Sequence, residues 1–134
     1  MHLVSFAGTC TFTSVSPVNF GNYDPFSLSN NDSAGSLTVR CTNGSPPVGG
    51  YILTLSAGNS GNYNARYLLN GTQHLNYNLY KDASRTQVWG NTGSTVVTIP
   101  ANGTTTSTIY GRISPGQDVG VGNYSDILVA TINF

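Results

Sequence analysis

Charged residues are scarce in this chain. Only 7% of its 134 residues are Asp, Glu, Lys or Arg, whereas ordinary globular chains have about 25%. The chain has one lysine, no glutamate and a formal net charge of zero. Because it lacks the basic surface that attracts nucleic acid or acidic lipid, we expect no nucleic-acid partner. The sequence also lacks a hydrophobic run long enough to span a membrane as a helix.

Residues that build metal and catalytic sites are equally few. With only His2 and His74 as histidines, the chain lacks the ligands for a zinc site, and we expect no metal and no cofactor. The five aspartates fall mostly in turns, and nothing points to a carboxylate pair for glycoside hydrolysis. Trp89 suits either a sugar-stacking platform or packed structure, and we expect the second. The sequence therefore predicts a protein that is not an enzyme.

The chain is rich in uncharged small and polar residues, namely Gly, Ser, Thr and Asn. These residues separate short runs in which apolar residues alternate with others. Turn signals such as "NNDSAG" and "WGNTG" recur about every 8–15 residues. The runs between them predict strands near residues 10–20, 35–42, 50–57, 66–69, 74–80, 95–99, 105–114 and 124–134. This spacing predicts one all-β domain, a β-sandwich of the immunoglobulin kind.

Cys10 and Cys41 fall on the first two predicted strands. They could be two buried free thiols, but a composition typical of exported proteins favours a disulfide between them. In the chain-entropy model such a bridge contributes about 3–4 kcal/mol.

The first residues also indicate export. Ser5 and Ala7 are small residues at positions −3 and −1 of a signal-peptidase cut after Ala7. We therefore divide the chain into a signal-peptide remnant, residues 1–7, and a domain, residues 8–134. The alternative is that residues 1–7 belong to the mature chain as a short N-terminal strand.

Seven segments carry a family resemblance. They are "VNFGNYDP" (18–25), "GSLTVRCTNG" (35–44), "YILTLSAG" (51–58), "ARYLLNG" (65–71), "LNYNLYKDASRTQVWG" (75–90), "IYGRI" (109–113) and "GNYSDILVATINF" (122–134). Together they resemble the spore coat protein U domain family, which supplies subunits of archaic chaperone–usher fimbriae. Two parts are the most specific. One is the central block, residues 77–80 followed by Arg85-Thr86 and Trp89-Gly90, and the other is the closing Tyr124-Ser125-Asp126 before a final strand.

The resemblance implies an incomplete immunoglobulin-like β-sandwich that lacks its last strand. The strand-acceptor groove left open would be lined by the core face of the final predicted strand: Leu128, Ala130, Ile132 and Phe134. The implied partners are a periplasmic pilus chaperone, a neighbouring pilus subunit that completes the fold by donor-strand complementation, and the outer-membrane usher. The implied location is a fimbrium on the cell surface, reached through the periplasm, with a role in attachment and biofilm formation.

Only nine residues precede Cys10, which is short for a donor segment. This favours a tip or adhesin domain, for which the candidate adhesive loop residues are Phe26, Leu28, Val48, Val119 and Val121. Two alternatives stay open. One is an ordinary fibre pilin, major or minor, with a truncated N-terminus. The other is a self-contained spore-coat or carbohydrate-binding β-sandwich.

Overall fold

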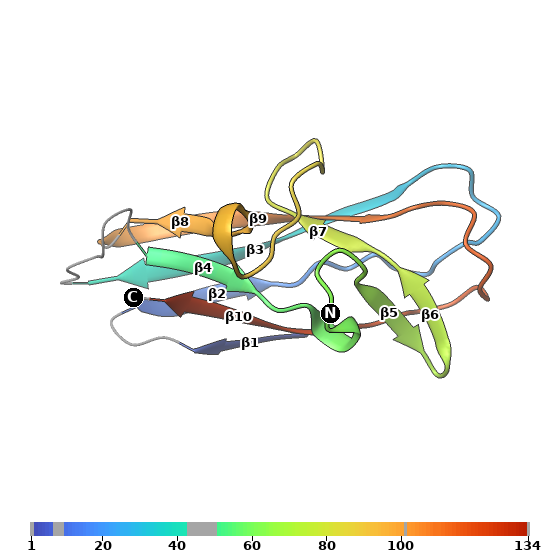
Figure 1. Cartoon of the computed structure of the whole chain (residues 1–134), viewed down its shortest axis with the longest axis horizontal. Helices are drawn as coiled ribbons and strands as arrows, with labels where there is room; N and C mark the ends of the chain where they lie inside the picture. Colours follow the sequence, from blue (N-terminus) through green and yellow to red (C-terminus); the bar gives the residue numbers. More distant parts are fainter. Residues whose placement is uncertain (1, 7–9, 43–50, 101, 134) are drawn as a thin grey trace.

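Two four-stranded sheets and a separate hairpin make up the chain (Figure 1). The computed structural model describes residues 10–42, 51–100 and 102–133, together with the backbone of residues 2–6. No helix in these ranges has the length and apolar character needed to cross a membrane. The arrangement confirms the expected all-β, immunoglobulin-like sandwich.

The first sheet has the strand order β2-β3-β9-β7 and is antiparallel throughout. Its strands are β2 (Cys10–Ser16), β3 (Asn31–Cys41), β9 (Gly103–Ile113) and β7 (Asn78–Tyr80). The second sheet has the order β1-β10-β4-β8. Its strands are β1 (His2–Phe6), β10 (Ile127–Asn133), β4 (Tyr51–Leu55) and β8 (Val97–Ile99). The hairpin consists of β5 (Tyr67–Asn70) and β6 (Gln73–Asn76).

Alternation of apolar residues explains why these segments pack as a sandwich. On β3 every second residue from Gly35 to Cys41 is buried, and on β10 the buried residues are Leu128, Ala130 and Ile132. A period of two places these side chains on one face of each sheet, so that the two inner faces form a common core. Trp89 lies in this core with no exposed surface, which confirms packed structure as its role.

The predicted strand over residues 74–80 is in fact two strands. β6 pairs with β5, whereas β7 pairs with β9 in the first sheet. Between them the backbone N–H of Tyr77 donates to the carbonyl of Arg66 at 3.1 Å. The chain thus changes its hydrogen-bonding partner at Tyr77 while its apolar alternation continues, so the alternation could not reveal the break.

Residues 2–6, which we interpreted as part of a signal remnant, form strand β1. The open alternative, an N-terminal strand, describes their backbone in this structure. Whether a signal peptidase removes them stays a prediction, because a segment can pair as a strand in one form of the chain and be cleaved in another.

Candidate functional site

Strand β10 is the first element of the candidate site. The side chains of Leu128, Ala130 and Ile132 are at most 4% exposed and lie in the core. Their neighbours on β4 are also buried, since Ala130 is paired with Leu55 and Ile132 with Leu53. Phe134, the fourth residue of the expected groove, lies outside the described residues.

The two edges of β10 are paired differently. Residues Ala130–Asn133 pair with β4 in antiparallel orientation. On the other edge, residues Ile127–Thr131 pair with residues His2–Phe6 of β1 in parallel orientation. The edge that we expected to be open is therefore occupied over five residues, and the occupying strand comes from the same chain. A parallel neighbour is unusual in a sandwich otherwise built from antiparallel pairs.

A buried carboxylate fixes the start of β10. Asp126 is 1% exposed, and its Oδ2 accepts a hydrogen bond of 2.6 Å from the Tyr77 hydroxyl. Its Oδ1 accepts from the backbone N–H groups of Asn59 at 2.9 Å and Ile127 at 2.8 Å. Burial, followed by the neighbouring Asp126 charge, raises the pKa of the Tyr77 hydroxyl, which keeps its proton and remains a donor.

Gly58 leaves room for this carboxylate. A Cβ atom at Gly58 would lie 2.3 Å from Oδ2 of Asp126, and the backbone there has φ +69°, which side chains other than glycine rarely adopt. The loop that follows β4 can therefore approach Asp126 closely enough for the Asn59 N–H to reach it. The sequence placed the aspartates mostly in turns and missed the burial of Asp126. The closing Tyr-Ser-Asp motif was the signal that could have revealed it.

Arg66 supports the same region from inside the core. Its guanidinium is fully buried and donates to the carbonyl of Ser56 at 2.7 Å, to the carbonyl of Trp89 at 2.7 Å and to Oδ1 of Asn78 at 2.9 Å. Burial lowers the pKa of Arg66. These bonds tie the loops after β4 and before β8 to β7, so the Arg66 guanidinium helps to hold the sandwich together.

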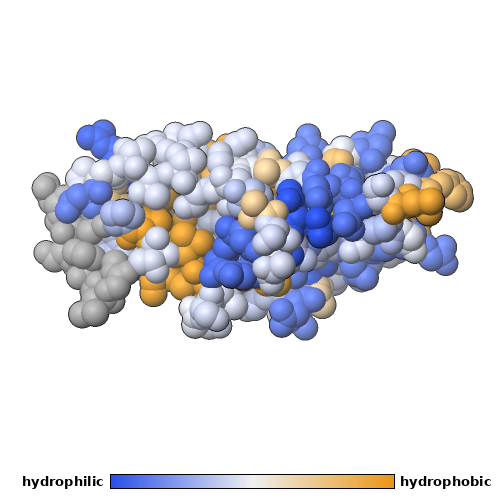
Figure 2. Space-filling view, turned by 90° about the horizontal axis from the view of Figure 1, so that it is seen from above, coloured by the Kyte–Doolittle hydropathy of each residue, from blue (hydrophilic) through white to orange (hydrophobic). Residues whose placement is uncertain are grey.

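Three of the five candidate adhesive residues are prominently exposed. Phe26 is 88%, Leu28 95% and Val121 71% exposed. Their two loops lie at the same end of the molecule (Figure 1), where backbone hydrogen bonds join Tyr23 to Gly122 in both directions. Figure 2 shows a hydrophobic patch at that end, next to hydrophilic surface. We call Phe26, Leu28 and Val121 the apolar tip.

The other two candidate adhesive residues, Val119 and Val48, do not belong to the apolar tip. Val119 is partly buried and packs against the core, so it supports its loop from beneath. Val48 lies outside the described residues. The segment that contains it follows Cys41, which is at the opposite end of β3 from Asn31, where the loop of Phe26 enters that strand.

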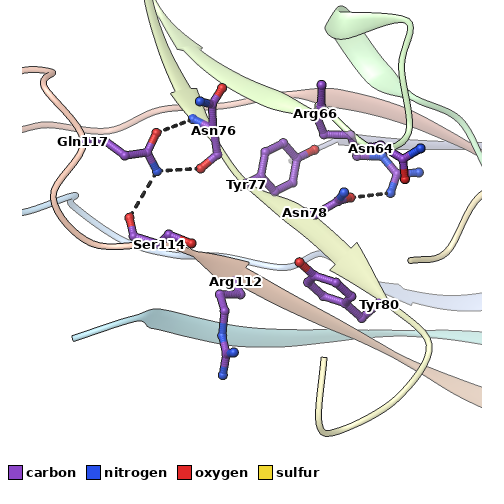
Figure 3. Close-up of a pocket in the computed structure, with 10 residues that line it drawn as sticks. Asn64, Arg66, Asn76, Tyr77, Asn78, Tyr80, Arg112, Ser114 and Gln117 are labelled. Carbon is purple, nitrogen blue, oxygen red and sulfur yellow. Dashed lines mark hydrogen bonds between the residues drawn. The ribbon is translucent and has the colours of Figure 1, made fainter. Parts of the chain in front are cut away.

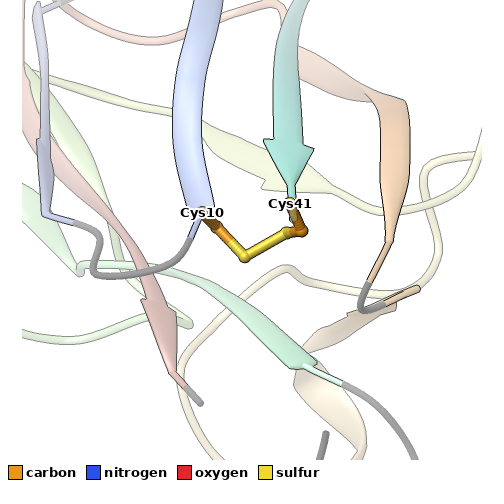
Figure 4. Close-up of a disulfide and its surroundings, with 2 residues drawn as sticks. All are labelled: Cys10 and Cys41. Atoms are coloured by element: carbon orange, nitrogen blue, oxygen red, sulfur yellow. A yellow bond between two sulfur atoms is a disulfide. The ribbon is translucent and has the colours of Figure 1, made fainter. Parts of the chain in front are cut away.

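Cys10 and Cys41 form a disulfide (Figure 4). Cys41 is the last residue of β3, whereas the loop of Phe26 enters that strand at Asn31. The two cysteines are directly paired residues on the neighbouring strands β2 and β3, and both are buried. This confirms the expected bridge between the first two predicted strands. The disulfide joins the edge strand β2 covalently to the centre of its sheet.

The remaining candidate for ligand chemistry, His74, stacks on the ring of Tyr67 with 4.1 Å between ring centroids. Among the described residues, no group of three His, Cys, Asp or Glu side chains could hold a metal ion.

Comparison with known proteins agrees with this arrangement. Residues 3–131 match the family model described as Spore Coat Protein U domain. The chain is similar to Protein U of Myxococcus xanthus, with 36% identity over 127 residues that cover 87% of this chain and 71% of the relative.

Among solved structures, the fold resembles a chain in the CsuC–CsuE chaperone–tip adhesion subunit pre-assembly complex, from archaic chaperone–usher Csu pili of Acinetobacter baumannii. The TM-score is 0.56 at 22% identity, over 77% of this chain and 34% of that chain. This chain thus spans about a third of the length of its structural neighbour, and the likeness concerns the fold.

Proposed function

Because the chain belongs to the spore coat protein U domain family, we propose that it is a non-enzymatic subunit of a chaperone–usher fimbria. In this proposal its β10 edge accepts a strand from a periplasmic chaperone and later from a neighbouring subunit. The structural neighbour, which was solved as a complex of a chaperone and a tip adhesion subunit, supports such partners. The subunit would travel through the periplasm and the usher to a surface fimbria.

One observation carries the proposal. The edge of β10 pairs with a strand, β1, that runs parallel to it and comes from the other end of the chain. This edge can therefore hold an added strand by main-chain hydrogen bonds, which is the way β-strand addition binds a partner. Alternating apolar residues in the added strand would give the contact its specificity.

Cleavage during export would free the edge of β10 that β1 occupies, and so prepare it for assembly. A cut after Ala7 would remove the whole of β1 and leave residues Ile127–Thr131 without their parallel neighbour. An uncovered strand edge favours aggregation unless another strand pairs with it. We propose that a chaperone strand takes this place after cleavage and that β1 occupies it before.

The strand-acceptor role can be tested by fusion. An alternating apolar peptide is joined after Phe134 through a flexible linker long enough to fold back along β10, in a chain from which residues 1–7 are deleted. We expect the fusion to raise the melting temperature and to suppress aggregation. Replacing the apolar residues of the peptide by Ser, as a matched control, should remove both effects.

Ile132→Asp in the same fusion should also block the rescue, because it buries an unpaired charge beside the added strand. If residues 8–134 alone form a high-melting, monodisperse monomer that the fused peptide does not stabilise further, the fold is complete without a partner and the proposal is wrong.

We further propose that the apolar tip is the adhesive surface, in surface attachment and biofilm formation. Clustered exposed apolar side chains mark binding surfaces, whereas scattered ones are ordinary. Replacing Phe26, Leu28 and Val121 by Ser should abolish attachment of assembled fimbriae to hydrophobic surfaces. A triple variant that assembles normally and attaches as before would refute this role. The exposed Val15, on β2 and outside the tip, provides the control substitution.

A further inference from the structure

A polar pocket lies beside β7. Its volume is about 450 Å³, within the range of about 300–1,000 Å³ that small-molecule sites occupy. Its walls come from the residues that join β6 to β7, the loop before β5, and the end of β9 with the loop that follows it (Figure 3). Among the described residues, no aspartate or glutamate lines it.

Three of the lining side chains form a fixed frame. Gln117 donates to the carbonyls of Asn76 at 2.8 Å and Ser114 at 3.1 Å, and it accepts from the Asn76 N–H at 2.8 Å. Asn78 donates to the carbonyl of Tyr63 at 2.6 Å and accepts from Arg66. Tyr77 is held by its bond to Asp126. These groups have little freedom to rearrange around a ligand.

Four other lining side chains have hydrogen-bonding groups that are not used within the described part of the chain. They are the amides of Asn64 and Asn76 and the hydroxyls of Tyr80 and Ser114. An amide offers both donors and an acceptor, and a hydroxyl offers one donor and two acceptor lone pairs. The pocket thus presents mixed donors and acceptors next to the half-buried ring of Tyr80.

The two arginines of the lining do not supply a charge for a ligand. Arg66 is fully buried and bonded to protein oxygens. Arg112 makes a two-point contact with the carboxylate of Asp32, at 2.8 and 3.0 Å. A complementary ligand is therefore neutral, rich in hydroxyl groups, and able to place a C–H face on an aromatic ring.

We propose that this pocket binds a neutral hexopyranose unit of a carbohydrate. Vicinal hydroxyls of the sugar pair with the free amides and hydroxyls, and its apolar face lies on Tyr80. Its described lining includes no residue of β10 or of the apolar tip, so the proposal does not depend on the fimbrial role proposed above.

The test is a titration of the ¹⁵N-labelled full chain with the methyl glycosides of glucose, galactose and mannose, followed by NMR. At least one glycoside should give saturable shifts centred on Asn64, Asn76 and Tyr80. Tyr80→Phe removes one hydroxyl and should weaken binding about three- to tenfold. Asn76→Ala should have a similar effect, because the Asn76 side chain is exposed and makes no hydrogen bond within the described residues. Tyr67→Phe and Asn91→Ala, outside the pocket, should leave the affinity unchanged.

Three outcomes would overturn the proposal. The first is the absence of saturable shifts with every glycoside. The second is a set of shifts centred elsewhere, or unaffected by both pocket variants. The third is tighter binding of glucuronate than of the methyl glucoside, which would show that charge and not hydroxyl pairing selects the ligand.

Discussion

The Tyr77–Asp126 pair should make a large contribution to stability, and Tyr77→Phe is the substitution that measures it. The variant removes one hydroxyl and keeps the ring, which is 5% exposed and part of the core. Oδ2 of Asp126 then loses its 2.6 Å donor in a place that water does not reach. Unlike a truncation to Ala, the substitution leaves no cavity of ring size. The change in the free energy of unfolding therefore measures the loss of the hydrogen bond.

The magnitude follows from the charge and burial of the acceptor. Hydrogen bonds to charged groups contribute about 1.5–3 kcal/mol, and an unsatisfied buried carboxylate oxygen adds a desolvation cost. We expect Tyr77→Phe to lower the free energy of unfolding by about 2–3 kcal/mol. For a chain of this length, about 3–5 °C per kcal/mol gives a fall of about 6–15 °C in melting temperature.

Urea unfolding followed by the fluorescence of the buried Trp89 measures the change directly. Tyr80→Phe is the matched control, because the Tyr80 hydroxyl makes no hydrogen bond within the described residues and its loss should cost less than about 0.5 kcal/mol. In a double-mutant cycle with Asp126→Asn, the two effects should be coupled by at least about 1 kcal/mol. Equal effects of Tyr77→Phe and Tyr80→Phe, or additive effects in the cycle, would refute the reasoning.

Three further predictions concern other parts of the fold. Cys41→Ser should destabilise the domain by about 3–4 kcal/mol, and mass spectrometry of periplasmic material should find Cys10 and Cys41 of the parent chain oxidised. Gly58→Ala should destabilise the domain more than an exposed Gly61→Ala, measured by thermal melting, because only at Gly58 would the added Cβ meet a buried carboxylate. The hydroxyl of Thr86, with further donors, lowers the pKa of Asp82. The ionised Asp82 carboxylate should therefore stabilise the fold fully above about pH 5 and lose this effect as the pH falls. In a plot of melting temperature against pH, Asp82→Asn should thus reduce the fall at acid pH.

The strands were predictable because apolar residues that alternate along the sequence become the buried face of a strand. The period of two in residues 35–41 and 128–132 fixes which side chains enter the core, and the structure buries them. Alternation says nothing about which strand lies alongside. The run over 74–80 therefore gave no sign of its division between two partners, and residues 2–6 gave no sign of pairing with β10.

The polar interior was harder to predict. Asp126 and Arg66 belong to residue types that usually lie at the surface, and sequence position alone does not show that each has its hydrogen bonds satisfied inside the sandwich. Their partners are distant in sequence: Asp126 bonds to Tyr77 and Asn59, and Arg66 bonds to Trp89. Such sites can be recognised only when the fold brings the partners together.

These buried contacts bear directly on how β10 could receive a partner strand. Asp126 fixes the start of β10 through Tyr77 and Asn59, and the backbone N–H of Ser56 donates to the carbonyl of Val129 at 2.9 Å. β4 holds the second half of the strand over Ala130–Asn133. None of these bonds involves β1, so we expect β10 to keep its shape when β1 is removed. Binding then requires conformational ordering of the incoming strand but not of β10. A larger part of the favourable contact free energy therefore remains as binding free energy.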